Sequence, residues 1–591
     1  MREMLRPRFP EPGIDAVHNE DVAAVFDDIA DLLDLQGANP FRIRAYRRAA
    51  LMLRGLPRDV ATIRAEGGDL RDLPGIGEDL AAQIEELLRT GHDTLLVRLR
   101  REFPRGATEL LRLPGLGPKR VRTLIDSLRV GNVRALRRAL KQGRLAGLPG
   151  FGPALIAKLT AASAPEAGAR LQRVPRGSAA RLAEPLAAAL RDVDGVQACE
   201  IAGSYRRGRD TVGDLDLVVC APDAGPVRRA LERHQEVRRL VASGPTRLTA
   251  MLHNGLQVDL RVVPAGSFGA ALHYFTGSKA HNIRVRARAR ELGLRISEYG
   301  VFRGARRLAG AREQDIFDAV GIDWIPPELR EDRGEFEAAA AHRLPRLVTR
   351  EDLKGDLHAH TRASDGALSI EAMALAARAA GLKYLAITDH ARHLGIVHGL
   401  DADALARQGD EIDALNGRLR GITLLKGVEV DVLPDGSLSL PDAVLGRLDL
   451  VIAAVHTQLG ASRVKQTARI LRALDRPCVS ILAHPAGRLL GAREPMQLDL
   501  GRVLRAAAAR PCYVELNTQP QRLDLDDVGC RAARDAGVLV SIASDAHDAS
   551  SFETLGTGVL QARRGWLEAA HVLNTLPLPR LRRLLRHTLC R

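Results

Sequence analysis

The sequence of 591 residues has few cysteines and no long apolar run. Its six cysteines are scattered and form no Cys-x-x-Cys pair, so neither a disulfide framework nor a zinc finger is predicted. No run of about 20 apolar residues is available to span a bilayer, and the first residues lack the apolar core of a signal peptide. We therefore expect a cytoplasmic protein with no membrane partner.

Lysine is missing from the first 118 residues, and the first lysine of the chain is Lys119. Arginine supplies the positive charge instead: the formal net charge is +15, and most of the excess lies in residues 1–352. A strongly basic chain favours a polyanionic partner, with nucleic acid first. Because 46% of the residues are hydrophobic, wholesale disorder is not expected, and the length suggests roughly three to five domains.

A short glycine motif occurs three times between segments with helical patterns: Leu73-Pro-Gly-Ile-Gly77, Leu113-Pro-Gly-Leu-Gly117 and Leu148-Pro-Gly-Phe-Gly152. Its glycines permit a tight turn between two helices, and the free N–H groups that open the second helix can face a phosphate. One copy would fit an ordinary helical hairpin equally well, but three copies favour helix-hairpin-helix binding to the DNA backbone. The expected DNA-binding residues are Gly75, Gly77, Gly115, Gly117, Lys119, Arg120, Gly150 and Gly152.

From about residue 178 the pattern changes to a helix followed by strands, which we predict at 196–201, 215–220 and 256–263. Residues two apart on a strand point to one face, so Asp214 and Asp216 aim two carboxylates at one spot. Such a pair is costly without a cation between them, and Mg²⁺ or Mn²⁺ suits this role. Asp259 can complete a two-metal site that activates an attacking 3′-hydroxyl and stabilises the leaving pyrophosphate.

The motif Gly203-Ser-Tyr-Arg-Arg-Gly208 precedes this acidic strand, and its turn and Arg207 are suited to holding a triphosphate. A lone Asp-x-Asp pair is weak evidence, but the three motifs in this order indicate nucleotidyl transfer and resemble the palm of family X DNA polymerases. Residues 273–282 and 297–302 resemble the thumb of that family. The resemblance implies that the dNTP is bound by Gly203, Ser204, Arg207, Gly213, Tyr274, Phe275, Gly277 and Asn282.

Within that family, the aromatic pair matching Tyr274 and Phe275 lies against the incoming sugar, and the residue matching Asn282 touches the base edge. Phe275 fits a place in the hydrophobic core equally well. Some members also use a lysine of the first domain as a Schiff-base nucleophile on 5′-deoxyribose phosphate, and that position falls at Gln83 here. Since an amide cannot form the imine and arginine stays protonated, we expect no such lyase.

Beyond residue 352, short apolar strands alternate with helices rich in Ala, Leu and Arg, which predicts a parallel sheet or barrel. We expect strands at 384–388, 423–429, 450–455, 479–482, 513–516 and 539–543. Histidines and acids recur at the C-terminal ends of these strands, where such folds place functional residues. Imidazoles with bridging carboxylates suit Zn²⁺ or Mn²⁺. The candidate metal ligands are His358, His360, Asp365, His390, Glu429, His456, His484, Asp545 and His547.

A single histidine is more often a core or surface residue than a ligand, but this set resembles the PHP phosphoesterase family, a distorted β/α barrel with up to three metals. All nine positions that bind metal in active members of that family carry a ligand here. The resemblance implies a metal-bound hydroxide that attacks a phosphodiester. Asn517 is expected beside the ligands.

These observations predict a multidomain protein: an α-helical helix-hairpin-helix region, an α+β nucleotidyltransferase palm and thumb, and a C-terminal α/β PHP barrel. The expected domains are an N-terminal helical domain (1–95), fingers (96–175), palm (176–264), thumb (265–330), linker (331–352) and PHP domain (353–591). The resemblance implies a DNA repair polymerase that fills gaps with dNTPs and a metal-dependent 3′-5′ exonuclease, with abasic-site cleavage left open. The partners would be gapped or nicked duplex DNA and dNTPs, bound by a monomer.

Other interpretations remain open from the sequence. The palm could adenylylate a small molecule or RNA while the barrel acts as a phosphomonoesterase, although the three glycine motifs argue against this. A polymerase or DNA-binding scaffold whose PHP domain only binds structural metal is the other alternative. The complete sets of palm carboxylates and barrel ligands argue against an inert domain.

Overall fold

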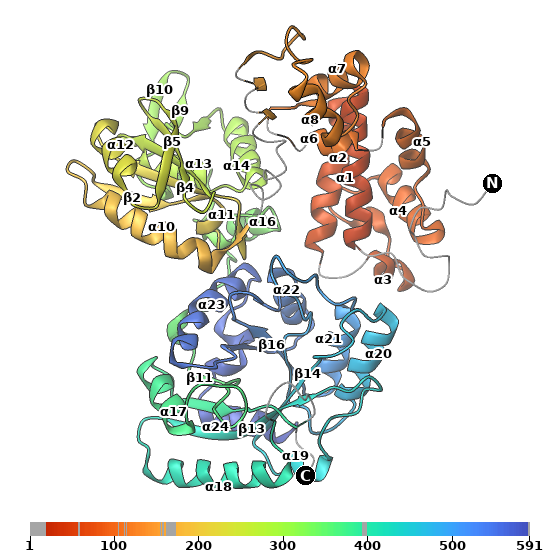
Figure 1. Cartoon of the computed structure of the whole chain (residues 1–591), viewed down its shortest axis with the longest axis vertical. Coiled ribbons are helices and arrows are strands. Elements are labelled where there is room, and N and C mark those ends of the chain that lie inside the picture. The colour runs from red at the N-terminus through yellow and green to blue at the C-terminus, as the bar shows by residue number, and fades with distance from the viewer. Residues whose placement is uncertain are drawn as a thin grey trace. The chain divides into compact units, whose positions relative to one another are not determined.

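The computed structural model describes residues 19–56, 60–104, 106–111, 113, 115–153, 155–156, 159–160, 173–392 and 399–588. The chain divides into two compact units, Met1–Gln172 and Arg173–Arg591 (Figure 1). We find no helix within the described ranges whose length and hydropathy would let it cross a membrane.

The first unit is helical throughout its described residues. Its core contains Phe26, Ile29, Leu53, Ile84 and Leu124, all fully buried. The elements are α1 (Asn19–Gln36), α2 (Pro40–Gly55), α3 (Val60–Ala65), η1 (Leu70–Asp72), α4 (Glu78–Thr90), α5 (Thr94–Glu102), α6 (Ala107–Leu111), α7 (Pro118–Leu128) and α8 (Val133–Lys141).

The three glycine motifs form the same kind of turn. Gly75, Gly115 and Gly150 have φ values of +82°, +92° and +83°, in the left-handed region that glycine adopts without steric cost. Gly77 and Gly117 are the N-caps of α4 and α7, and no side chain caps either helix. The first N–H groups of both helices therefore lack a partner within the helix and are available to an acceptor.

The second unit begins with the palm, a five-stranded sheet in the order β2-β4-β7-β6-β5. The predicted strands are confirmed, because β2 (Ala198–Ile201), β4 (Asp214–Cys220) and β7 (Gln257–Val263) fall within or overlap them. The other palm elements are β1 (Val174–Pro175), α10 (Arg176–Arg191), α11 (Gly203–Arg206), β3 (Thr211–Val212), α12 (Ala224–Arg233), β5 (Val237–Ser243) and β6 (Arg247–Leu252).

The thumb follows the palm and packs two helices against a small antiparallel sheet with the order β10-β9-β8. Its elements are η3 (Ala265–Ser267), α13 (Phe268–Thr276), α14 (Lys279–Glu291), β8 (Arg295–Ser297), β9 (Gly300–Arg303), β10 (Arg306–Ala309), α15 (Gln314–Ala319) and η4 (Pro327–Leu329). Residues 331–352, expected to be a linker, contain α16 (Glu335–Ala340) and η5 (Arg350–Asp352). Phe336 and Leu347 of this segment pack into the thumb core with Phe317.

The C-terminal part is a nearly closed parallel barrel. Seven strands pair in chain order from β11 to β17, and a parallel bridge between Ala359 and Ala546 joins the segments that follow the first and last strands. All six predicted strands are confirmed. The strands are β11 (Gly355–Asp356), β12 (Tyr384–Ile387), β13 (Thr423–Asp431), β14 (Leu450–Ala454), β15 (Ile481–Leu482), β16 (Tyr513–Asn517) and β17 (Val540–Ala543).

Helices surround these strands (Figure 1). They are α17 (Ile370–Ala379), α18 (Ala402–Arg418), α19 (Asp442–Leu445), α20 (Arg463–Leu474), α21 (Leu500–Ala509), α22 (Asp527–Asp535), α23 (Leu555–Arg564) and α24 (Leu578–Arg586), with the short turns η6 (Ala549–Thr554), η7 (Ala569–His571) and η8 (Leu573–Thr575).

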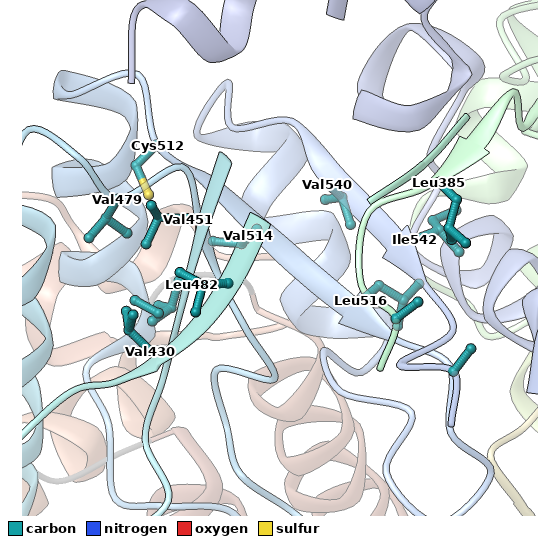
Figure 2. Packing of buried hydrophobic residues seen from close by; sticks show 14 of the residues in the cluster. Leu385, Val430, Val451, Val479, Leu482, Cys512, Val514, Leu516, Val540 and Ile542 are labelled. Carbon is teal, nitrogen blue, oxygen red and sulfur yellow. The ribbon is translucent and has the colours of Figure 1, made fainter. Parts of the chain in front are cut away.

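Successive strand residues of the barrel point either to an apolar core or to the opposite face, which carries Glu429. Val430, Val451, Val514 and Ile542 belong to one large apolar cluster beneath the helices (Figure 2). Because successive residues of a strand point to opposite faces, Glu429 on β13 lies on the other face from Val430. Most strand residues are apolar, with Lys426 on β13 and Ser541 on β17 among the exceptions, which is typical of a parallel sheet buried on both faces.

Candidate active sites

Three carboxylates meet on the palm sheet where β4 and β7 run side by side. The parallel register places Asp216 directly beside Asp259, and Asp214 lies two residues earlier on the same face of β4. Burial, followed by the charges of Asp214 and Asp259, raises the pKa of Asp216 to about 7. A divalent cation would relieve this repulsion, and carboxylate oxygens are ligands that Mg²⁺ and Mn²⁺ accept.

Neighbouring side chains fix the orientation of the Asp259 carboxylate. The Thr249 hydroxyl donates to Asp259 Oδ1 at 2.7 Å and Arg247 donates to the same oxygen at 3.2 Å. The Gln257 side-chain amide donates to Oδ2 at 2.6 Å. Sequence reasoning named none of these donors, since Thr249 is found opposite Asp259 only once the antiparallel register of β6 and β7 is known.

Gly203 opens the turn that lies against these carboxylates. It has a φ of +60°, and a Cβ at this position would lie 2.2 Å from Asp216 Oδ2. Both the backbone conformation and the close approach therefore require glycine. The main chain can then come near a ligand that is bound by the carboxylates.

The palm and thumb line an open cavity of about 500 Å³ beside the carboxylates. Asp214 and Asp216 line it together with seven of the eight residues predicted to bind the dNTP: Gly203, Ser204, Arg207, Tyr274, Phe275, Gly277 and Asn282. Gly213 and Asp259 are not among its lining residues. Three further cations line the cavity, Arg173, Lys279 and Arg286, and Arg173 and Arg286 carried no sequence motif by which to find them.

The aromatic pair of the thumb lies at the wall of this cavity. The Tyr274 and Phe275 rings are 5.2 Å apart and nearly perpendicular, at 76°, and the Arg261 guanidinium lies 5.0 Å from the centre of the Phe275 ring. Phe275 packs partly against a small buried cluster while also lining the cavity, and its contact with a nucleotide sugar stays a prediction. The Asn282 amide donates to the Tyr274 carbonyl at 2.7 Å.

The two arginines of the Gly203–Gly208 turn have different partners. Arg206 forms a forked pair with Glu313 of the thumb, at 2.6 and 2.9 Å. Arg207 donates from Nε to Glu331 Oε1 at 3.1 Å and from Nη1 to the Thr276 carbonyl. Arg207 therefore lines the cavity, while the Arg206 side chain is paired with Glu313 of the thumb.

Two residues of the first unit, Arg120 and Gln83, form hydrogen bonds within that unit. Arg120 donates to the carbonyls of Gly115 and Gly150, at 2.9 and 3.0 Å, and so bridges the second and third glycine turns. Lys119 is exposed at the start of α7. The Gln83 side-chain amide donates to the Tyr46 hydroxyl at 2.9 Å.

The nine predicted ligands of the barrel gather around one buried carboxylate. Glu429 is 2% exposed, and its oxygens lie between 3.0 and 3.6 Å from nitrogens of five histidines. Asp365 lies 3.4 Å from His390 and 3.3 Å from His547, and Asp545 lies 3.1 Å from His360. The five histidines around Glu429 are His358, His360, His390, His456 and His484.

Three groups within this cluster have the spacing of a metal site: His360 with Asp365, His390 and His547; His358 with His360 and Asp545; and His390 with Glu429 and His456. His358 Nε2 and both ring nitrogens of His360 are buried without a hydrogen-bond partner. Buried polar atoms rarely stay unpaired, so these nitrogens fit metal coordination. Burial would raise the pKa of Glu429, but the surrounding imidazoles hold it well below its usual range.

Further acidic side chains contact the second ring nitrogen of the predicted ligand histidines and so orient them. Glu515 Oε1 lies 2.7 Å from His358 Nδ1 and Asp431 Oδ1 lies 2.8 Å from His456 Nδ1. Asn517 donates to Asp545 Oδ2 at 3.0 Å, as its place beside the ligands predicted. Carboxylates that hold the second nitrogen of a ligand histidine are typical of metal sites. The sequence marks these acids by their spacing, because residues two apart on a strand point to the same face. Asp431 is two residues after Glu429, and Glu515 is two residues before Asn517.

Comparison with known families matches five segments between residues 17 and 518. The matching families are a Helix-hairpin-helix domain (residues 17–93), a SAM-like Helix-hairpin-helix tandem (107–163), the DNA polymerase beta palm (173–267), the DNA polymerase beta thumb (271–331) and the PHP domain (356–518).

Three relatives show how far the likeness extends. The DNA polymerase/3′-5′ exonuclease PolX of Bacillus subtilis (strain 168) is 37% identical over 566 residues, 95% of this chain and 98% of that protein. DNA polymerase lambda of Rattus norvegicus is 25% identical over 354 residues, 53% of this chain and 56% of its own. A probable phosphatase of Thermoanaerobacter sp. (strain X514) is 30% identical over 213 residues, 34% of this chain and 82% of its own.

The fold and the two sites define a nucleotidyltransferase of the polymerase beta type that is fused to a PHP phosphoesterase domain. The chain belongs to the bacterial-type family X DNA polymerases that carry this domain at the C-terminus. The family resemblance, the fold class and the enzyme class predicted from the motifs are thereby confirmed. Both halves of the chain are of metal-dependent types, and the candidate ligand groups of the barrel agree with this.

Proposed function

We propose that this protein fills gaps in duplex DNA with its palm and removes 3′-terminal nucleotides with its barrel. In the palm, Asp214, Asp216 and Asp259 bind two Mg²⁺ or Mn²⁺ ions. The observation that carries this half is the cavity beside the carboxylates, which is lined by Arg207, Tyr274 and most of the other residues expected to bind a nucleotide. The raised pKa of Asp216 supports a cation requirement.

Within the proposed pocket, the residues divide by chemistry. Ser204 and Arg207, which line the cavity, are suited to a triphosphate, while Tyr274, Phe275 and Asn282 are suited to the sugar and base. Arg173, Lys279 and Arg286 add positive charge to the same wall.

The barrel is proposed to hold Zn²⁺, Mn²⁺ or both, and to cut phosphodiesters at the 3′ end. A closed structural site takes about four ligands, whereas hydrolytic sites keep a position for water. Eight of the nine predicted ligands fall into overlapping groups, and the ninth, His484, lies 3.2 Å from Glu429. This number exceeds the needs of one ion. When bound, such a cluster supplies an activated hydroxide and neutralises charge on the phosphate; the ligand residues hold and orient it.

The first unit is proposed to bind gapped or nicked DNA through its three glycine turns. The free N–H groups at the start of α4 and α7 and the exposed Lys119 suit a phosphate backbone rather than particular bases. Arg120 would act mainly by fixing the second and third turns to each other. The protein is expected to act as a monomer, which light scattering with and without DNA can check.

One assay tests this proposal against its rivals. A duplex with a one-nucleotide gap is incubated with dNTPs, and then without them, before and after chelation and return of Mn²⁺ or Zn²⁺. The proposal predicts extension with dNTPs, 3′-end shortening without them, and loss of both on chelation. Extension without any shortening would mean that the barrel is structural, and the absence of both activities would mean that the chain is a DNA-binding scaffold.

A further inference from the structure

A buried set of charges joins the barrel to the nucleotide pocket of the palm. Arg564, the last residue of α23, is 2% exposed. Its Nη1 donates to Glu331 Oε1 at 3.0 Å and to the main-chain carbonyl of Arg207 at 2.8 Å. Its Nη2 donates to Asp527 Oδ2 on α22 at 2.7 Å. One arginine of the barrel therefore bonds both the main chain of a pocket residue and the acid that pairs with it.

Glu331 completes the connection to the pocket. Its Oε1 accepts from Arg207 Nε at 3.1 Å as well as from Arg564. Burial would raise the pKa of Glu331, but Arg564 and then Arg207 more than offset this effect and lower it to about 2. Glu331 is therefore ionised at neutral pH. It holds the Arg207 side chain, which is only 13% exposed, in one orientation at the cavity wall.

The barrel side of the contact is also rigid. Arg333 Nη1 donates to Asp527 Oδ2 at 2.9 Å, so Asp527 is fixed between two arginines. Gly208 of the palm lies against α23: a Cβ there would lie 3.4 Å from Leu560 Cβ and 3.6 Å from Arg564 Cδ. Since packed groups of this kind leave few alternative side-chain positions, the arrangement transmits the position of α23 to the palm turn.

Arg563, the residue beside Arg564, also contacts the rest of the second unit but has different partners. The barrel can therefore be joined to its neighbours without any bond to Glu331 or to the Arg207 main chain. Arg563, on the same helix, donates to Glu328 Oε1 at 2.7 Å and to the Val348 carbonyl at 3.2 Å. These two bonds also join the barrel to the thumb, at Glu328, and to the segment that follows it, at Val348. Arg563 bonds neither Glu331 nor the Arg207 main chain, and so provides a matched comparison.

We propose that Arg564 of the barrel is a positioning residue for nucleotide binding in the palm, acting through Glu331 and the main chain of Arg207. The proposal rests on the proposed assignment of Arg207 to the triphosphate. A guanidinium that is held in place before the nucleotide arrives loses less entropy on binding. Removal of Arg564 should therefore weaken nucleotide binding more than turnover or DNA binding. Polymerisation would thus depend on the barrel for more than its nuclease.

The test compares Arg564→Gln with Arg563→Gln and Arg207→Gln in the full-length protein. Single-nucleotide gap filling gives kcat and the KM for dNTP, and anisotropy gives the Kd for gapped DNA. Removing charge-assisted hydrogen bonds of this kind predicts a rise of about tenfold in the KM of Arg564→Gln, with kcat and Kd within about twofold of wild type. Arg563→Gln should keep the wild-type KM, and 3′-end degradation should be unchanged in both.

Each outcome decides the matter. A wild-type KM in Arg564→Gln, or an equal rise in Arg563→Gln, would overturn the positioning role. If Arg207→Gln itself keeps the wild-type KM, the assignment of Arg207 to the triphosphate fails instead. Should Arg564→Gln also lose 3′-end degradation, the barrel has been disrupted and Asp527→Asn decides. A raised KM with intact degradation in that variant supports the role, and a wild-type KM overturns it.

Discussion

Asp216 on β4 lies directly beside Asp259 on β7, because the two strands pair in parallel with these residues in register. The two carboxylates come from positions 43 residues apart in the sequence, and only strand pairing brings them together. Gly203 lies on the other side of Asp216, with space for a hydrogen and no more. The geometry of the palm site therefore depends on close packing as well as on charge.

Gly203→Ala should abolish most nucleotide addition. The new Cβ would lie 2.2 Å from Asp216 Oδ2, so the carboxylate or the turn must move, and misplacing a metal ligand costs several kcal/mol of transition-state stabilisation. We expect a fall in kcat of roughly a hundredfold or more, measured by gap filling.

The matched control for this variant is Gly195→Ala. Gly195 shares a positive φ, +85°, but a Cβ there would meet no atom within 4 Å. It should lose some stability and keep its polymerase rate. Equal losses of activity in the two variants would attribute the effect to backbone strain and not to the carboxylate contact.

Glu515→Gln should weaken metal binding in the barrel. Glu515 holds His358 Nδ1 at 2.7 Å and accepts the main-chain N–H of His484 at 2.7 Å. Loss of such a supporting carboxylate typically costs about 10–100-fold in metal affinity. Titration of the chelated protein with Mn²⁺ or Zn²⁺, followed by 3′-end degradation, measures the change. Glu411→Gln, at an exposed position of α18, is the control, and equal affinities would contradict the role of Glu515.

No Schiff-base lyase should operate from the first domain. Gln83 occupies the expected position and donates to Tyr46, and residues 1–118 contain no lysine. Borohydride reduction in the presence of a 5′-deoxyribose phosphate substrate should leave no adduct in this region. A trapped adduct that peptide mapping places on a side chain of residues 1–118 would show that another nucleophile exists.

Glu331→Gln should reduce stability at neutral pH and much less in acid. The folded protein lowers the pKa of Glu331 from 4.5 to about 2. The ionised group therefore contributes stability above about pH 4.5, and this contribution is lost as the pH falls towards 2. Urea midpoints for wild type and variant at pH 7, 5, 4 and 3 should converge as the pH falls. A difference that stays constant would mean that the charge of Glu331 contributes nothing.

The strands and the clustering of the candidate metal ligands were predictable because their signals are local. Apolar runs ending in Thr388-Asp-His390 or Gly427-Val-Glu429 mark both a buried strand and its functional end, and the structure has β12 and β13 there. The Arg564 contacts were not predictable. Arg564 and Arg207 are 357 residues apart, and an arginine at the end of an amphipathic helix is common, so its burial becomes apparent only when the domains are packed. Residues 331–352 illustrate the same limit, since their polar composition gave no sign that Phe336 is buried.

The division of labour between palm and barrel is tested most directly by two variants on one substrate. Asp259→Ala and His360→Ala are assayed on a gapped duplex, with dNTPs for extension and without them for 3′-end degradation. We predict opposite losses: Asp259→Ala degrades at the wild-type rate and loses extension by roughly a thousandfold, while His360→Ala extends normally and no longer degrades. Degradation at the wild-type rate by His360→Ala, or substantial extension by Asp259→Ala, would contradict it.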